Sequence, residues 1–382
     1  MAVNNNSAVA QTLTELVRID SVSARSNVEI VELIAARAES AGLYTRRLPY
    51  ADEQGVEKYN LVAVAPRATR DDELIELALV GHTDTVPFDP TWTDALTLTE
   101  SDGRLYGRGA CDTKAFIAAA LGALAQFDLE QLKRPLALVC TADEEIGCLG
   151  AKRLADARAF KARYSIVGEP TSLRPVRAGK GYCLAEVTVG GREGHSAYPA
   201  LGASAIFRAA RLITRIEAVA EKLKAEQHAA FDPPYTTINV GLIGGGTAKN
   251  IIAGACRFTL EWRPVPGQAA TRVVDLIKAE VENLRAQDAE FDCRIDVVRL
   301  DEASETDADS PLVQHLEAAT GQPSGTIAFG TEAPQLTELG AQAVVFGPGH
   351  ITDAHRTGEF VPGAELNACV EILAGAIKYF CY

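Results

Sequence analysis

The chain has 382 residues, of which 47% are hydrophobic and 23% are charged, and its formal net charge at pH 7 is −14. These proportions are typical of a soluble globular protein large enough for two domains. An acidic surface repels nucleic acid and anionic membranes, so we expect neither as a partner. The N-terminal stretch MAVNNNSAVAQTL lacks the basic and apolar parts of a secretory signal, and no apolar run reaches transmembrane length. With eight cysteines and no C-x-x-C pair, the sequence predicts reduced thiols and a cytoplasmic location.

Residues 1–178 are expected to alternate helices and strands. A helix is predicted through Leu13, Leu16 and Val17, and a second over residues 27–41, where Gly42 favours its end. The further elements expected in this part are strands at 60–65, 74–80, 135–140 and 164–168, with helices at 113–127 and 149–159. Several of these strands are apolar throughout, which indicates burial on both faces. The pattern therefore predicts an α/β fold with a mainly parallel sheet and helices on both faces.

The pattern changes near residue 180. The stretch YCLAEVTVGG alternates like a half-exposed strand; the elements that follow are a helix at 203–227, the strands YTTINVGLIGG and ACRFTLEWRPV, a helix at 269–286 and the strand CRIDVVRL. This β-α-β-β-α-β order predicts a ferredoxin-like α+β domain. From Ser310 the first pattern resumes, with the apolar strand QAVVFG and a final helix at 362–379. We therefore predict a catalytic domain made of residues 1–178 and 304–382, with residues 179–303 inserted into it as a second domain.

Acidic and histidine side chains follow the strands of the first domain. The residues that come after strands are His82 and Asp84, Glu144 and Glu145, Glu169, and His355, while Asp112 stands just before a helix. Each of them alone is most simply a solvated loop residue. In open α/β sheets, however, ligands bind beyond the carboxyl ends of the strands. Collected at one edge of one sheet, these side chains favour a ligand site.

The residue types in this set point to a divalent metal. Two histidines and several carboxylates, without a thiolate, suit zinc or a similar ion. The number of candidates favours two ions that share a bridging carboxylate. Glu144 and Glu145 are adjacent, so one can bind metal while the other acts as general base. On an extended segment His82 and Asp84 share a face, so Asp84 can orient the imidazole.

Six stretches, in chain order, resemble one known family. They are GHTDTVP, GRGACDTK, TADEEIG, GEPTSLRPVRAGKG, GHSAYP and FGPGHITDAH, and they are similar to the zinc-dependent aminoacylase and carboxypeptidase family, which includes succinyl-diaminopimelate desuccinylase. The resemblance implies two divalent ions, Zn²⁺ with Co²⁺ as a possible substitute. The roles it implies are His82 and Glu169 on one ion, Glu145 and His355 on the other, Asp112 as the bridge, Glu144 as general base and Asp84 behind His82.

The same resemblance assigns roles outside this cluster. From the residues alone, His195 in the inserted domain is as well explained as a surface histidine. The resemblance implies that it reaches the active site of a neighbouring subunit in a homodimer, built through the inserted domain, and stabilises an oxyanion. It further implies that Asn250 and Arg263 hold the substrate carboxylate and that the peptide bond after Asp112 is cis. Glu332 can receive a cationic side chain of the substrate or be an ordinary surface glutamate.

The implied reaction is hydrolysis of a linear amide in a small-molecule N-acyl amino acid. Long stretches of the chain resemble the branch of the family that converts N2-acetyl-L-ornithine to L-ornithine and acetate in arginine biosynthesis. A succinyl-diaminopimelate desuccinylase and a broad N-acyl-amino-acid deacylase are the alternatives within the family. A metal-holding binding protein that has lost catalysis is the alternative outside enzymes, and the presence of Glu144 with all five ligand candidates argues against it.

Overall fold

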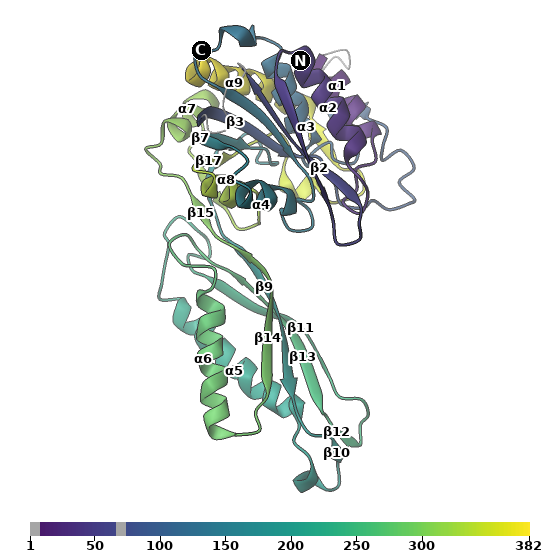
Figure 1. Cartoon of the computed structure of the whole chain (residues 1–382), viewed down its shortest axis with the longest axis vertical. Coiled ribbons are helices and arrows are strands. Elements are labelled where there is room, and N and C mark those ends of the chain that lie inside the picture. The colour runs from purple at the N-terminus through teal and green to yellow at the C-terminus, as the bar shows by residue number, and fades with distance from the viewer. Residues whose placement is uncertain (1–7, 66–73) are drawn as a thin grey trace. The chain divides into compact units, whose positions relative to one another are not determined.

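The structure of the protein, a computed structural model, describes residues 8–65 and 74–382 (Figure 1). These residues form two compact units. Unit 1 contains the chain up to Arg177 together with Thr306–Gly325 and Thr331–Tyr382, and unit 2 contains Ala178–Glu305 and Thr326–Gly330. No helix in the described part of the chain is long and apolar enough to cross a membrane.

A mainly parallel sheet forms the centre of unit 1. Its strands, in spatial order, are β1 (Tyr44–Ala51), β2 (Glu57–Ala65), β6 (Leu136–Thr141), β3 (Leu74–His82), β7 (Lys161–Val167), β17 (Gln342–Val345) and the start of β8 (Val176–Gly179). The strands from β6 to β17 run parallel, whereas β1 and β2 are antiparallel additions at one edge. The predicted α/β class with a mainly parallel sheet is confirmed.

Helices cover both faces of this sheet. Leu77 and Leu79 of β3 belong to a core shared with helices of one face. Ala78 and Val80, the alternate residues of the strand, are buried as well. This alternation requires cover on each side, because successive side chains of a strand point to opposite faces. The helices of unit 1 are α1 (Ala8–Arg18), α2 (Val28–Ser40), α3 (Lys114–Leu124), α4 (Leu149–Asp156), α7 (Pro311–Thr320), α8 (Ala333–Glu338) and α9 (Gly363–Cys381), with 3-10 turns at Leu129–Gln131 and Ile351–Asp353.

A second, small sheet in unit 1 was not predicted. It consists of β4 (Thr99–Ser101), β5 (Arg104–Tyr106) and β18 (Phe360–Pro362), in the order β18-β5-β4. The strands have three residues each, too few for an alternation to be recognised in the sequence. This sheet joins the segment before Asp112 to the segment after His355.

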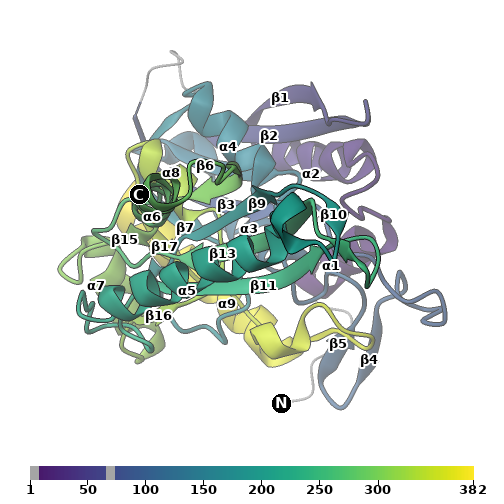
Figure 2. The same cartoon turned by 90° about the horizontal axis from the view of Figure 1, so that it is seen from below.

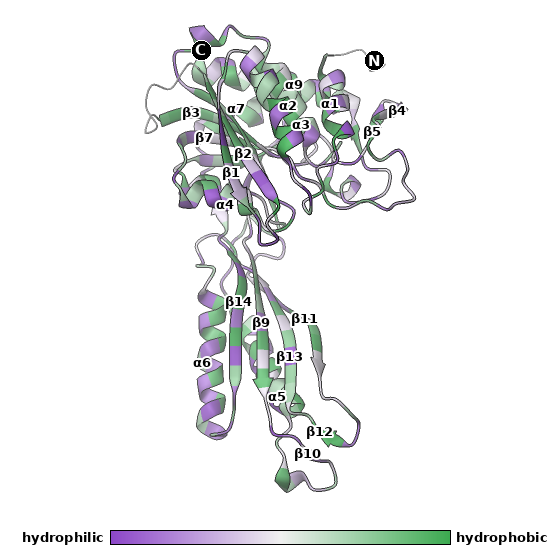
Figure 3. Cartoon of the chain, turned by 45° about the vertical axis from the view of Figure 1, so that its right-hand side comes forward, coloured by the Kyte–Doolittle hydropathy of each residue, from purple (hydrophilic) through white to green (hydrophobic). Residues whose placement is uncertain are grey.

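Unit 2 is an antiparallel sheet packed against two helices. Along the chain its main elements are β9 (Tyr182–Gly190), α5 (Ala205–Leu223), β11 (Thr237–Gly245), β13 (Ala255–Arg263), α6 (Arg272–Gln287) and β14 (Cys293–Asp301), and the sheet order is β11-β13-β9-β14. The predicted β-α-β-β-α-β ferredoxin-like arrangement is confirmed. Figure 2 shows α5 lying along β11 and β13. Hydrophobic and hydrophilic residues alternate along α6 and the strands, as one buried face requires (Figure 3).

Short elements complete unit 2 and the passage between the units. They are β10 (Gly194–His195), a 3-10 turn at Pro199–Leu201, β12 (Ile251–Ile252), β15 (Ser304–Glu305) and β16 (Gly325–Ile327). Strand β10 pairs with β12. The stretch PTSLRPVRAGKG, which reads as a linker, contains strand β8.

Candidate metal centre and active site

The parallel strands of unit 1 bring the predicted ligands to one edge of the sheet. In the register, His82 at the end of β3 is opposite Thr141 at the end of β6, and Val80 is opposite Val167 at the end of β7. The carboxyl ends of these strands are therefore level. Glu144 and Glu145 follow β6, and Glu169 follows β7, so the loops that carry them begin side by side.

Within the described residues, two groups of side chains could each hold a metal ion. The first contains His82, Asp112 and Glu169, and the second contains Asp112, Glu145 and His355. In each group the potential ligand atoms lie within 4.8 Å of one another. The structure thus brings together all five predicted ligands, and Asp112 is common to both groups.

Asp112 faces a different histidine with each of its oxygens. Its Oδ1 lies 3.0 Å from Nε2 of His82, and its Oδ2 lies 3.0 Å from Nε2 of His355. Glu145 also reaches Nε2 of His355, with Oε2 at 3.0 Å. A carboxylate whose two oxygens face two separate donor groups has the geometry that a bridging ligand needs. The peptide bond between Asp112 and Thr113 is cis.

The charges of these buried groups fit a cation. Burial raises the pKa of Glu169 well above its ordinary value and raises that of Glu145, and the carboxylate of Asp112 adds to both effects. Burial lowers the pKa of His82, but its hydrogen bond with Asp112 and the surrounding carboxylates outweigh this and leave it well above its usual value. Buried carboxylates that outnumber the two histidines are costly without further positive charge. A donor set of imidazole nitrogens and carboxylate oxygens suits a divalent ion such as zinc.

The sequence predicts that the side chain of Asp84 orients the His82 ring, but the backbone of Asp84 makes the shorter contact with that ring. His82 Nδ1 lies 3.0 Å from the backbone carbonyl of Asp84 and 3.7 Å from its carboxylate, so the carbonyl is the group that orients the ring. The Asp84 carboxylate instead accepts hydrogen bonds from the N–H groups of Glu144 (3.1 Å) and Glu145 (3.2 Å). The hydroxyl of Ser23 donates to it as well, at 2.7 Å. Asp84 therefore fixes the backbone of the loop that carries both glutamates.

Glu144 stands beside the two groups, and among the described residues it is a member of neither. Burial raises its pKa to about 8; His82 opposes this effect, and the carboxylate of Glu145 adds to it. The thiol of Cys148 donates to Glu144 Oε1 at 3.3 Å. A cation bound nearby would favour the ionised form of this carboxyl. A carboxylate outside the ligand groups with a pKa near neutrality suits a general base.

Two buried residues support this loop and were missed in the sequence. Lys58 of β2 lies 2.9 Å from Asp143, and both side chains are buried. Lys58 also donates to the backbone carbonyls of Ser23 and Arg25. Asp143, with φ of 57°, has a left-handed backbone directly before Glu144, a conformation often found at functional sites. The one available signal was a lysine directly before the apolar run of the strand EKYNLVAVA.

Glu332 lies in unit 1 near the same strand ends. It is buried, beside the hydroxyl of Thr141, so the reading as an ordinary surface glutamate is wrong. Its Oε1 has no hydrogen-bond partner among residues 8–65 and 74–382. Burial raises its pKa to about 7, against the opposing effect of His82. An unpaired, buried carboxyl oxygen is a candidate acceptor for a ligand group.

The remaining predicted residues lie in unit 2. His195 is exposed on β10, and Asn250 immediately precedes β12, whose Ile251 pairs with His195. The carbonyl of Asn250 accepts a hydrogen bond of 3.1 Å from the N–H of Ser196, so these two predicted residues are neighbours. Arg263 lies at the other end of β13, where its guanidinium is 4.4 Å from the centre of the Tyr182 ring. Unit 2 thus carries its candidates at two separate places.

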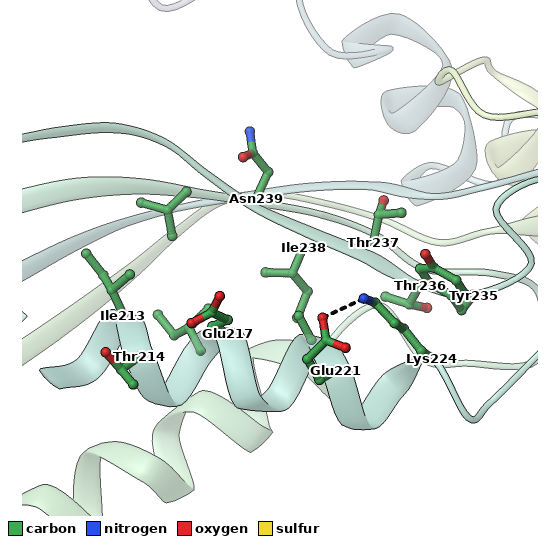
Figure 4. Close-up of a pocket in the computed structure, with 13 residues that line it drawn as sticks. Ile213, Thr214, Glu217, Glu221, Lys224, Tyr235, Thr236, Thr237, Ile238 and Asn239 are labelled. Atoms are coloured by element: carbon green, nitrogen blue, oxygen red, sulfur yellow. Dashed lines mark hydrogen bonds and ion pairs between the residues drawn. The ribbon is translucent and has the colours of Figure 1, made fainter. Parts of the chain in front are cut away.

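A cavity of about 500 Å³ lies between α5 and β11 of unit 2 (Figure 4). Figure 4 shows Glu221 of α5 and Lys224, the residue just after this helix, pointing toward each other, with an ion pair of 2.5 Å between them. Among the residues that the structure describes, the lining includes no predicted site residue. This cavity is therefore separate from the residues chosen for chemistry.

Comparisons with known proteins agree with this geometry. The sequence matches the family described as peptidase family M20/M25/M40 over residues 78–379. It is 54% identical over 375 residues to a protein from Myxococcus xanthus named acetylornithine deacetylase, with 98% of each chain covered. It is 36% identical to a protein of the same name from Proteus mirabilis (strain HI4320), with 95% of this chain and 92% of that protein covered.

Solved structures show the same fold. A tripeptidase from Staphylococcus aureus aligns with a TM-score of 0.77 at 24% identity, over 100% of this chain and 99% of that one. An M20 family metallo-carboxypeptidase from Sulfolobus solfataricus aligns with a TM-score of 0.75 at 19% identity, over 98% of this chain and 99% of that one. Because both identities are below 25%, these alignments show a shared fold and nothing further.

Proposed function

Because this chain belongs to peptidase family M20/M25/M40, we propose that it is a metal-dependent hydrolase that converts N2-acetyl-L-ornithine and water to L-ornithine and acetate. The resemblance read from the sequence motifs is confirmed by the family match. The substrate rests on the relatives named acetylornithine deacetylase, which favour it over succinyl-diaminopimelate. The observation that carries the reaction class is the cluster of five ligand candidates, of which His82, Asp112 and Glu169 are buried; among the described residues Glu144 stands beside this cluster and belongs to neither group.

The two groups would hold two divalent ions. His82 and Glu169 belong to one, Glu145 and His355 to the other, and Asp112 to both. We take Zn²⁺ as the ion, with Co²⁺ as a substitute, because the ligands are nitrogen and oxygen donors. When bound, such ions polarise an amide carbonyl and make a water molecule more acidic.

The proton transfers fall to Glu144. Its carboxylate takes a proton from the attacking water and then delivers it to the departing amine nitrogen. The hydrogen bonds from the N–H groups of Glu144 and Glu145 to Asp84 keep this loop in place during both transfers. Fixed placement of the base matters because a proton moves only over hydrogen-bond distance.

Four further residues are assigned to substrate recognition and to the oxyanion. The unpaired Oε1 of buried Glu332 suits the ammonium group of an ornithine side chain. The guanidinium of Arg263 can bind a carboxylate through two parallel hydrogen bonds, and Asn250 can add a donor. His195 adds a donor for the oxyanion that forms on the amide carbonyl.

We propose that unit 2 serves as a lid and joins two copies into a homodimer. Strand β11 is an edge of its sheet, and it exposes Leu242 (71%) and Ile243 (59%). Phe207 near the start of α5 is 75% exposed. Unpaired strand edges with apolar side chains are typical of association surfaces. His195, itself exposed and next to Asn250, would then be available to the partner's active site.

The cellular setting follows from the substrate. An enzyme that releases ornithine for arginine synthesis would act in the cytoplasm. The eight cysteines are free and buried, as is usual for proteins of a reducing compartment.

A substrate panel tests this function. Purified protein loaded with Zn²⁺ or Co²⁺ is given N-acetylornithine, N-acetylglutamate, N-acetylmethionine and succinyl-diaminopimelate, and released amine is measured. We expect the highest kcat/KM with N-acetylornithine. A succinylated substrate that wins by orders of magnitude would replace the proposed substrate, and comparable rates on all acetylated compounds would indicate a broad deacylase. Absence of any amine from protein with two bound ions would refute the enzymatic function.

A further inference from the structure

Glu359 accepts hydrogen bonds from the backbone at Asp112, the ligand candidate common to both groups. It lies between His355 and β18 and is 1% exposed. Its Oε1 accepts hydrogen bonds from the N–H groups of Cys111 (2.9 Å) and Asp112 (3.0 Å). Its own backbone carbonyl accepts a third, of 3.0 Å, from the N–H of Gly107. One residue from the far end of the chain thus holds the stretch that leads into Asp112.

Arg108 fixes the other oxygen of this carboxylate. Its Nη1 lies 2.5 Å from Glu359 Oε2, and the arginine is also buried. A second nitrogen, Nη2, donates to the carbonyl of Pro87 at 3.3 Å, and the guanidinium lies 5.4 Å from the centre of the Trp92 ring. Both oxygens of Glu359 therefore have set partners, and the side chain has little freedom to turn.

The Arg108–Glu359 ion pair is connected to the candidate metal centre through the backbone of Asp112. A buried ion pair is a poor source of stability, because desolvation offsets much of its attraction. It can still fix geometry, since hydrogen bonds from N–H groups to a carboxylate are stronger than neutral ones. Here the fixed backbone belongs to Asp112, whose two oxygens face His82 and His355. Glu359 is also four residues after His355, so one short segment connects both sides of the second ligand group.

We propose that Glu359 is a positioning residue for the metal centre. Its carboxylate holds the Cys111–Asp112 backbone so that one oxygen of Asp112 faces each ligand group. The inference rests on the proposed two-metal function of that site. Because Asp112 is common to both groups, loss of the hydrogen bonds to Glu359 should weaken the binding of both ions.

The test compares Glu359→Gln with Glu76→Gln. The first change keeps size and one acceptor oxygen but removes the charge opposite Arg108. Glu76 is the matched control, since it is a buried carboxylate of β3 paired with Arg134 (3.0 Å) and Arg163 (3.2 Å). Metal-free proteins are titrated with Co²⁺, followed by visible absorption and calorimetry, and thermal unfolding of each metal-free protein reports on its fold.

We expect E359Q to bind both ions about 10- to 100-fold more weakly, the usual effect of losing a partner of a ligand, while E76Q binds them as the wild type does. Unchanged binding by E359Q, or weakening of one ion alone, would overturn the inference. If E359Q does not fold, Arg108→Lys replaces it and must weaken both ions in the same proportion; no weakening or unequal weakening overturns the inference. A wild-type protein that fails to bind two ions would refute the proposed metal centre instead.

Discussion

At the scale of single residues, most of the ligand candidates follow the ends of parallel strands, and the side chains that support them come from distant parts of the chain. Strand ends are visible in the sequence, and in a parallel sheet they share one edge, which is why His82, Glu145 and Glu169 could be grouped beforehand. Asp112 stands before a helix, and its role as the bridge came from the family resemblance. The supports come from distant positions: Ser23 is 61 residues from Asp84, and Glu359 is 247 residues from Asp112. A single sequence contains no signal for hydrogen bonds over such separations.

Replacing Glu144 with alanine should separate catalysis from metal binding. Because Glu144 is in neither ligand group among the described residues, Glu144→Ala should keep both ions and lose about 10²- to 10⁴-fold in kcat, as expected for a lost general base. Metal content after dialysis and steady-state kinetics measure the two effects. The adjacent Glu145→Ala is the contrast and should lose metal. Normal turnover by Glu144→Ala would remove this residue as the base.

Replacing Glu332 with glutamine should affect one class of substrate. If its buried carboxylate receives the side-chain ammonium of ornithine, Glu332→Gln removes a charge-assisted hydrogen bond worth about 1.5–3 kcal/mol. The kcat/KM for N-acetylornithine should then fall by roughly 10- to 100-fold. N-acetylmethionine, whose side chain is uncharged, serves as control and should lose little. An equal loss on both substrates would speak against a role in specificity.

At the scale of elements, length and burial decided what could be predicted. Strand β6 and all of β3 except Glu76 and His82 consist mainly of apolar residues, and their sequences predict buried strands. Strand β1 is half exposed and contains Pro49, so its sequence has neither a continuous apolar run nor a clean alternation. Strand β8 is short and follows a stretch with Pro170 and Pro175, which favours a linker. Its pairing with β17 comes from tertiary contacts.

Gly150, in the first turn of α4, is packed too closely to carry a side chain. A Cβ on Gly150 would lie 2.3 Å from the carbonyl oxygen of Ala142 and 2.5 Å from Asn60 Oδ1. Gly150→Ala should therefore lower the free energy of unfolding by about 1–3 kcal/mol, the usual cost of overpacking. Gly122→Ala in α3 is the control, since its Cβ would meet only ordinary contacts, with Val370 at 3.4 Å. Urea denaturation of both variants measures this, and equal stability would contradict it.

At the scale of the whole molecule, two patterns in one sequence indicated two units. Continuous apolar strands belong to unit 1 and alternating strands to unit 2, because one sheet is covered on both faces and the other on one. Such a pattern does not indicate which exposed strand edge would contact a second copy of the chain. The structure shows that β11 is a sheet edge with exposed apolar side chains, and this is why we propose that edge for the dimer.

A charge on that edge should disrupt the proposed dimer. Leu242→Asp places a carboxylate on exposed β11 and should shift the protein toward monomers, measured by sedimentation velocity. If His195 acts across the dimer, kcat for N-acetylornithine should fall in parallel. Val298→Asp is the matched control, because Val298 is 66% exposed on β14, the opposite edge of the same sheet. Dissociation by the control alone would move the interface to β14.

The division of unit 1 into separate segments has a consequence during protein synthesis. Unit 2 lies almost wholly in one continuous segment, so it is complete before its host is. At about 5–20 residues per second, residues 178–305 take on the order of ten seconds to translate. Throughout that time β7 lacks its parallel neighbour β17, and the nascent chain lacks His355. A growing polypeptide therefore exposes an open apolar strand edge to chaperones or to aggregation, and it lacks the complete set of ligand candidates until His355 has emerged from the ribosome.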